Sequence, residues 1–258
     1  MAGGSSHAKI RIVSLAPNVT SILLALGVGS ELIGVSKWCK DVANVGRRPQ
    51  VGDCWKMNIR EVMQLKPTML IGSVPFAADT VAKILAEAVT FVAINPRSLA
   101  DIESDIRTLG RIANRSANAK NLILKLTQSF AAVVRAAKKN RAESRPRVYC
   151  EAWPKPRISS PPWVAELVQL AGGTMVGAAG ERVTDEEVAH AKPDVIVLAW
   201  AATGDRAKPA SALRNPAWQD VPAIKSRRVF VIRDELLNTP GPPLIKGAWE
   251  LLRVIHRT

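Results

Sequence analysis

The sequence contains no apolar run long enough to cross a membrane. Its longest apolar stretches, around Ile22–Leu26 and Val195–Ala199, fall far short of the roughly 18 residues that a membrane-spanning helix needs. The segment Met1–Lys9 is rich in Gly and Ser, but it has neither the basic start and apolar middle of a signal peptide nor a lipid-anchor cysteine. Two interpretations stay open: an export signal lies outside this sequence, or the protein works in the cytoplasm.

Cysteine is scarce, which excludes a disulfide-stapled scaffold. The three cysteines are Cys39, Cys54 and Cys150. Cys150 lies in an apolar, strand-like stretch and is expected in the core. Cys39 and Cys54 lie in loop-like stretches beside tryptophans, so a disulfide between them and a contact with a ligand are both open.

Histidine and the common catalytic motifs are scarce as well. His7 lies in the N-terminal tail, His190 in an expected helix and His256 at the C-terminus, and no His, Cys or carboxylate spacing is typical of a zinc site. The sequence has no Gly-x-x-x-x-Gly-Lys-Ser/Thr phosphate loop and no Gly-x-Gly-x-x-Gly after its first strand. We therefore predict that the protein is not an enzyme, with no catalytic residues, no metal site and no catalytic cofactor.

Positive charge, in contrast, is in excess. The net charge is +14, and residues 115–145 account for half of it, with eight Lys and Arg and one acidic residue. A basic helix can bind nucleic acid or an anionic membrane, but Phe130 is the only aromatic residue in this segment, so bases would find no stacking platform. We favour a solvated helix face without a nucleic-acid partner. A basic nucleic-acid-binding protein remains the alternative from a different functional class.

A diverged internal repeat organises the chain. Residues 58–72 and 184–198 each begin with a residue able to cap a helix, Asn58 or Thr184. Each copy continues with a short helix pattern, a Lys-Pro pair that ends the helix, and an apolar strand. The expected strands around the repeat are Arg11–Ala16, Leu32–Ser36, Thr90–Ile94, Arg147–Ala152, Val195–Ala199 and Arg228–Ile232.

Strands that alternate with helices predict an α/β fold with parallel sheets. Because the pattern is present twice, we expect two Rossmann-like lobes, an N-terminal lobe over residues 1–114 and a C-terminal lobe over 146–258. Residues 115–145 between them read as one linker helix, with its helical pattern over Ser116–Glu143. A single rigid helix between the lobes predicts only modest hinge motion. Separately, we expect the protein to be a monomer.

Tryptophan is concentrated where the expected strands end. Ligands of parallel sheets bind beyond the carboxyl ends of the strands, so two facing lobes would place these loops along a cleft. Trp38, Trp55, Trp153 and Trp200 all fall in such loops. Local packing would explain any one of them, but the four together favour a large, flat, hydrophobic ligand. The other tryptophans, Trp163, Trp218 and Trp249, and also Tyr149, are expected in the core.

Polar side chains share these loops and could bind the edge of such a ligand. Each alone also fits a solvated loop residue or a helix cap. The set consists of Asn18, Asp53, Lys56, Asn95, Arg97, Glu151, Arg157, Asp234, Glu235 and Asn238.

Several segments, in order along the chain, resemble cobalamin-binding members of the class of solute-binding proteins with a helical backbone. The resemblance covers about residues 10–256 and rests on these segments: Arg11–Thr20, Gly34–Cys39, Met57–Pro67, Arg147–Trp153 and Arg233–Pro242. It implies a periplasmic or other extracytoplasmic protein that holds a corrinoid between its lobes and delivers it to the membrane permease of an ABC importer. Relatives that bind ferric siderophores or haem share the fold, so both ligands remain alternatives.

The resemblance also implies individual site residues. Trp38 and Trp55 fall on matching first-lobe positions, and loop position adds Trp153, Arg157, Trp200, Asn18, Asp234 and Asn238. Relatives dock on the permease through one acidic residue per lobe at the start of the repeated helix. The matching residue is Glu186 in the second lobe, but Arg60 in the first, with Glu61 beside it. Because neighbouring residues of a helix point about 100° apart, this departure puts symmetric docking in question.

Overall fold

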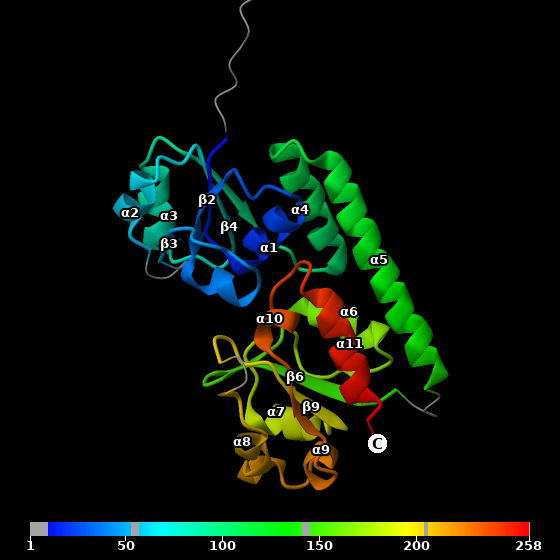
Figure 1. Cartoon of the computed structure of the whole chain (residues 1–258). Helices are drawn as coiled ribbons and strands as arrows, with labels where there is room; N and C mark the ends of the chain where they lie inside the picture. Colours follow the sequence, from blue (N-terminus) through cyan, green and yellow to red (C-terminus); the bar gives the residue numbers. More distant parts are fainter. Residues whose placement is uncertain (1–9, 53–56, 141–144, 204–205, 258) are drawn as a thin grey trace, which may run out of the picture. The chain divides into compact units, whose positions relative to one another are not determined.

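The computed structural model describes residues 10–52, 57–140, 145–203 and 206–257 (Figure 1). Two compact units divide the chain: the described residues up to Asn95 together with Ser104–Leu122, and Pro96–Glu103 together with the residues from Ile123 onward. Both units contain a largely parallel sheet with helices, so the predicted α/β fold class is confirmed. Helices α4 (Leu99–Ile112) and α5 (Ser116–Lys139) each hold residues of both units, and the predicted boundaries at 114 and 146 stay predictions.

The first unit is built on a fully parallel sheet. Its strands lie in the order β3-β2-β1-β4-β5, so β1 pairs with both β2 and β4 at the centre. Buried apolar side chains of the strands pack against α2 and α3, with Val13, Leu70 and Ile84 in one cluster. The elements are β1 Ile12–Ser14, α1 Pro17–Ala25, β2 Leu32–Ser36, η1 Lys37–Asp41, β3 Gln50–Val51, α2 Ile59–Gln64, β4 Met69–Ser73, α3 Ala78–Leu85 and β5 Thr90–Ile94.

The second unit repeats this plan with one exception. Strands β10, β9, β6 and β8 pair in parallel, whereas β7 turns back antiparallel to β6 as a hairpin. The elements are β6 Arg147–Pro154, β7 Arg157–Ser159, α6 Pro162–Leu170, β8 Thr174–Met175, α7 Asp185–His190, β9 Val195–Leu198, α8 Pro209–Leu213, η3 Pro216–Trp218, α9 Pro222–Lys225, β10 Val229–Val231, α10 Asp234–Leu237 and α11 Leu244–Ile255.

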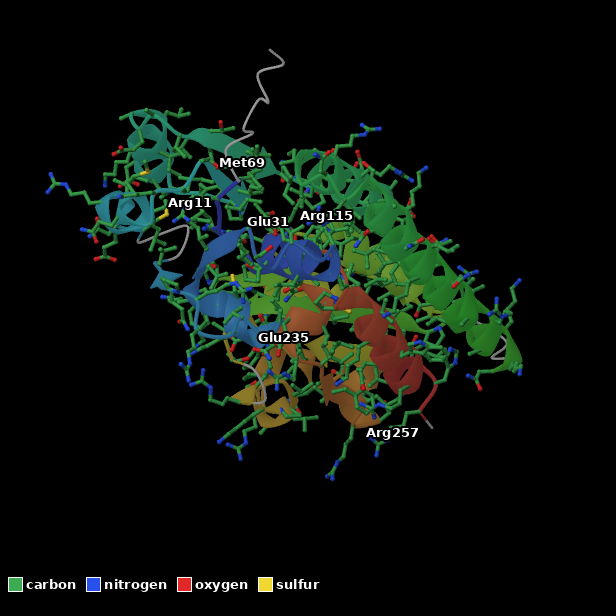
Figure 2. The ribbon with its side chains drawn as sticks, turned by 45° about the horizontal axis from the view of Figure 1, so that its top comes forward. Arg11, Glu31, Met69, Arg115, Glu235 and Arg257 are labelled. Atoms are coloured by element: carbon green, nitrogen blue, oxygen red, sulfur yellow. The ribbon has the colours of Figure 1, made fainter. Side chains whose placement is uncertain are left out.

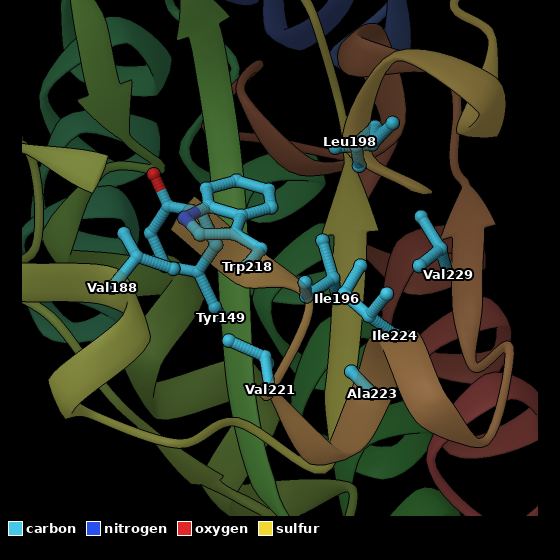
Figure 3. Packing of buried hydrophobic residues seen from close by; sticks show 10 residues of the cluster. Tyr149, Val188, Ile196, Leu198, Trp218, Val221, Ala223, Ile224 and Val229 are labelled. Carbon is cyan, nitrogen blue, oxygen red and sulfur yellow. The ribbon is translucent and has the colours of Figure 1, made fainter. Parts of the chain in front are cut away.

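The core of the second unit is centred on two aromatic rings. Tyr149 of β6 and Trp218 of η3 are fully buried and meet edge to face, with ring centroids 6.2 Å apart (Figure 3). The predictions that Tyr149, Trp163, Trp218 and Cys150 lie in the core are therefore confirmed.

The prediction that Trp249 also lies in the core is wrong, because this residue is 41% exposed. Helix α11 buries Leu244, Ala248, Leu251 and Ile255, which recur three to four residues apart along one face. Trp249 follows Ala248 by one residue, so it points about 100° away from that face.

Both copies of the repeat form the same local structure. The side chain of Asn58 accepts a hydrogen bond from the Arg60 backbone N–H at 3.1 Å, and Thr184 forms a capping box with Glu187. Two residues after each helix, a lysine adopts the left-handed region directly before proline, with φ of 52° at Lys66 and 44° at Lys192. A proline cannot continue the helix, so the chain leaves it at the same point in both copies.

The predicted linker helix forms without interruption over Ser116–Lys139, and residues 141–144 lie outside the described part. Its 24 residues span about 36 Å at 1.5 Å per residue. Just before it, Arg115 pairs with Glu31 of the first unit, with the guanidinium and carboxylate 3.1 Å apart (Figure 2). No helix among the described residues is long and apolar enough to cross a membrane.

Candidate ligand-binding residues

In the first unit, Asn18 has a buried side-chain NH2 group that finds no acceptor among the described residues. It is the second residue of α1, which follows the carboxyl end of β1, and it is only 4% exposed. Its Nδ2 has no hydrogen-bond partner among the described residues. An unsatisfied buried donor costs about 1–3 kcal/mol.

Trp38 lies at the end of the neighbouring strand β2, on the short helix η1. Its side chain is 38% exposed, and the Lys37 ammonium lies 4.7 Å from the centre of its ring. Cys39 of the same helix is buried, and its sulfur lies 3.0 Å from Thr20 Oγ1 and 3.1 Å from Ser36 Oγ. Burial raises the pKa of the Cys39 thiol, which favours its neutral form.

The residues between Gly52 and Met57 are not described. Asp53, Cys54, Trp55 and Lys56 belong to them, so the place of Trp55 and the pairing of Cys39 with Cys54 stay predictions.

In the second unit, the carboxylate of Glu151 lies at the centre of a buried polar cluster. Glu151 of β6 is 1% exposed, and its Oε1 accepts the indole N–H of Trp200 at 2.8 Å. Its Oε2 accepts the hydroxyl of Tyr149 at 3.1 Å and a charged N–H of Arg157. Burial raises the pKa of Glu151, while Arg157, Trp200 and Tyr149 act in the opposite direction by binding the charged form.

Arg157 connects this cluster to helix α7. Its Nε donates to Asp185 Oδ1 at 2.8 Å, and the same oxygen accepts Asn215 Nδ2 at 3.0 Å. The guanidinium also stacks over the Trp218 ring, 4.3 Å from its centre. Burial is the largest cause and lowers the pKa of Arg157, but Glu151, Tyr149 and Asp185 together outweigh it, so the pKa is raised.

Trp153 and Trp200 come from neighbouring strand ends. The N–H of Ala201 donates to the carbonyl of Ala152 at 3.0 Å, which continues the pairing of β6 with β9 beyond its last register position. Trp153 is 40% exposed, with its indole N–H donating to the Lys155 carbonyl at 2.8 Å, whereas Trp200 is half-buried. Both tryptophans therefore lie at the carboxyl ends of neighbouring strands, one exposed and the other half-buried.

Asp234 and Asn238 join the same end of the sheet from α10. Asn238 Nδ2 donates to the Ala199 carbonyl at 2.8 Å, and its buried Oδ1 has no partner among the described residues. Asp234 Oδ2 accepts the Ala202 N–H at 3.4 Å. Burial, and next the charge of Glu235, raise the pKa of Asp234 to about 6.

The two expected docking residues, Glu61 and Glu186, are both exposed in the first turns of α2 and α7. Glu61 accepts a hydrogen bond from Asn58 Nδ2 at 3.0 Å. Their role in docking stays a prediction.

Sequence reasoning missed the internal partners of Arg157. The sequence predicted Glu151 as a polar loop residue and Tyr149 as a core residue, and it indicated no role for Asp185 or Asn215. The available signal was a glutamate within an otherwise apolar strand pattern, since a buried charge needs a partner. Among the described residues, no group of three or more His, Cys, Asp or Glu side chains could hold a metal ion.

Two α/β units of like plan, each with aromatic and amide side chains at the carboxyl ends of its strands, define a solute-binding protein. The chain belongs to the periplasmic binding protein family, whose model matches residues 12–236. Substrate-binding proteins of this kind serve ABC importers: they bind a small molecule and interact with a membrane permease.

Three proteins similar to this chain have names that give no ligand, vitamin B12 and heme, respectively. The chain is 25% identical over 256 residues to an uncharacterized ABC transporter substrate-binding lipoprotein of Bacillus subtilis, covering 95% of this chain and 80% of that protein. It is 27% identical over 244 residues to the vitamin B12-binding protein of Vibrio cholerae, covering 90% and 84%. A solved periplasmic heme-binding protein from Roseiflexus shares the fold, with a TM-score of 0.82, 22% identity and coverage of 96% and 98%.

Proposed function

We propose that this protein binds cobalamin or a related corrinoid and delivers it to the permease of an ABC importer. A corrinoid has a flat apolar body fringed by neutral amides. The observation that carries the proposal is that each unit has an exposed tryptophan at the carboxyl end of a strand, Trp38 in the first and Trp153 in the second, which suits such an apolar face. The B12-binding name of the Vibrio cholerae relative supports the same ligand.

The charges among the site residues favour a neutral ligand over haem or a ferric siderophore. Haem carries two carboxylates, and those would need cationic partners. Of the eight residues predicted to bind the ligand by resemblance and loop position, Arg157 is the cation, and it is already paired with Glu151 and Asp185. Asp234 adds a carboxylate to the same set.

The test is titration of the purified protein with cyanocobalamin, haemin and a ferric siderophore, followed by tryptophan fluorescence and by calorimetry. We expect saturable quenching with cyanocobalamin at micromolar protein and no competition from the iron compounds. Preferential binding of haemin or the siderophore would reassign the ligand, and indifference to all three would reject the proposal.

A set of tryptophan variants locates the binding residues. Trp38→Ala and Trp153→Ala should each weaken cyanocobalamin binding by about 2- to 10-fold, which corresponds to the loss of one aromatic contact. Trp249→Ala is the matched control, because Trp249 is exposed to the same degree but belongs to α11. If all three variants weakened binding equally, the assignment of the site would be wrong.

Delivery to the permease is tested separately from binding. Glu61→Gln and Glu186→Gln should reduce uptake by the reconstituted importer and leave the cyanocobalamin Kd unchanged, because both residues are exposed on helices α2 and α7. Arg60→Glu places an acidic residue at the first-lobe position where the resemblance implies one, so it should raise uptake if docking is symmetric. Unchanged uptake in all three variants would refute this docking surface.

A further inference from the structure

The indole of Trp200 is held by an ionised side chain in the interior of the second unit. Trp200 Nε1 donates to Glu151 Oε1 at 2.8 Å, and Glu151 is 1% exposed. Trp153, the neighbouring indole, donates instead to a backbone carbonyl, that of Lys155, at 2.8 Å. Hydrogen bonds to a charged acceptor are stronger and more directional than those to a neutral one. Of these two indoles, Trp200 is therefore the one with the more fixed orientation.

The carboxylate that holds Trp200 is itself fixed on its other side. Glu151 Oε2 receives the Tyr149 hydroxyl and the Arg157 guanidinium, so both of its oxygens have partners. Arg157 in turn binds Asp185 and stacks on the buried Trp218 ring. A buried polar cluster with every group satisfied is rigid, because no member can move without leaving a partner unpaired.

We propose that Glu151 is a positioning residue that fixes Trp200 for ligand contact, and that Arg157 links this carboxylate to the start of helix α7. The inference rests on the proposed function, in which Trp200 touches the ligand. It adds a residue that touches no ligand but sets the geometry of one that does.

The link to α7 follows from the position of Asp185. Asp185 is the first residue of that helix, and the exposed Glu186 is the second. The guanidinium of Arg157 spans the distance between Glu151 and Asp185 with direct contacts to both carboxylates. A rotation of Trp200 that breaks its hydrogen bond leaves Glu151 without one of its partners. Only the Arg157 side chain separates this carboxylate from Asp185 at the N-terminus of α7.

A double-mutant cycle separates positioning from general stability. Glu151→Gln and Trp200→Phe should each weaken cyanocobalamin binding by roughly tenfold, the factor of one hydrogen bond to a charged group. The double variant should be no weaker than Trp200→Phe alone, because the carboxylate acts only through the indole. Additive losses would overturn the proposal.

Glu31→Gln is the matched control for the cycle. Glu31 also forms a half-buried pair with an arginine, Arg115 at 3.1 Å, but in the first unit and before the start of β2. This variant should lower the melting temperature and leave the cyanocobalamin Kd unchanged. A tenfold loss of affinity in Glu31→Gln would show that any broken ion pair weakens binding, and the specific role of Glu151 would be rejected.

An experiment without ligand keeps the inference testable if Glu151→Gln does not fold or if cyanocobalamin does not bind. In the wild-type protein, hydrogen exchange of the Trp200 indole N–H is followed by NMR, with Trp200→Phe used to assign its resonance. Exchange should be slowed at least tenfold relative to the indole N–H of Trp249, which is 41% exposed. Exchange as fast as that of Trp249 would refute the positioning role, whereas slow exchange without cyanocobalamin binding would reject the proposed ligand alone.

Discussion

Replacing Asp234 by Asn should stabilise the protein at neutral pH and have almost no effect below about pH 4. The pKa of Asp234 is raised to about 6, first by burial and then by repulsion from Glu235. The folded protein therefore binds the proton more tightly than the unfolded chain does. Its stabilising contribution is complete while both states are protonated, and it is lost as the pH rises through 6.

The magnitude follows from the size of the shift. A rise from 3.8 to about 6 corresponds to an upper limit of about 3 kcal/mol at 1.36 kcal/mol per pKa unit. Asp234 is only half-buried, and solvent screening reduces this to about 1 kcal/mol. The amide oxygen of Asn can still accept the Ala202 N–H, so the substitution removes the charge and keeps the hydrogen bond.

The assay is thermal unfolding of the wild type and of Asp234→Asn at pH values from 3.5 to 7.5 without ligand. The variant should melt about 2–4 °C higher at pH 7.5, and the two curves should meet below about pH 4. Asp220→Asn is the control: Asp220 is exposed, and Lys225 lowers its pKa, so its small effect should have the opposite sign. If the melting difference of Asp234→Asn were constant across this pH range, titration of the buried carboxyl would be excluded as its cause.

Three further substitutions test the backbone of the second unit, each by its thermal midpoint. Thr184→Ala should cost about 1 kcal/mol, because it removes the cap that accepts the Glu187 N–H at 3.1 Å; an unchanged midpoint would contradict the capping box. Gly247→Ala should cost about 3 kcal/mol or more, since the new Cβ would lie 2.0 Å from the Leu236 carbonyl oxygen, and a stable variant would show that α10 and α11 can separate. Lys192→Gly should raise the free energy of unfolding by about 0.5 kcal/mol. Glycine adopts the φ of 44° at this position without steric strain, and this gain exceeds the entropy that the more flexible glycine loses on folding; a lower midpoint would refute this.

The strands of both sheets were predictable where the apolar run is long and its ends are marked. Leu32–Ser36 and Thr90–Ile94 form strands with the predicted bounds, because polar residues or Gly, Pro and Asn stand close to their ends. The repeated helix was predictable for the same reason, since the cap at Thr184 and the proline at position 193 mark both of its ends.

Strands β7 and β8 were not predicted. β7 has three residues and β8 has two, and neither lies in a longer apolar run such as those that reveal the equally short β1 and β10. β7 exists because the chain turns back after Pro154 and pairs with β6, so its cause lies in the hairpin as a whole. Trp249 was misassigned because an indole on a helix is expected in the core, and only the orientation of the whole helix shows which residues face out.

The position of a site residue was predictable from the sequence, but its tertiary contacts were not. Loop position alone correctly indicates which side chains lie at the carboxyl ends of strands, as Asp234 and Asn238 show by their contacts with the segment after β9. It does not indicate whether a cation in such a loop is available to a ligand. Arg157 has the same sequence surroundings whether it faces a ligand or a buried glutamate six residues earlier. Only the hairpin that returns Arg157 alongside Glu151 shows that its charge is already balanced, and that the same carboxylate accepts the indole N–H of Trp200.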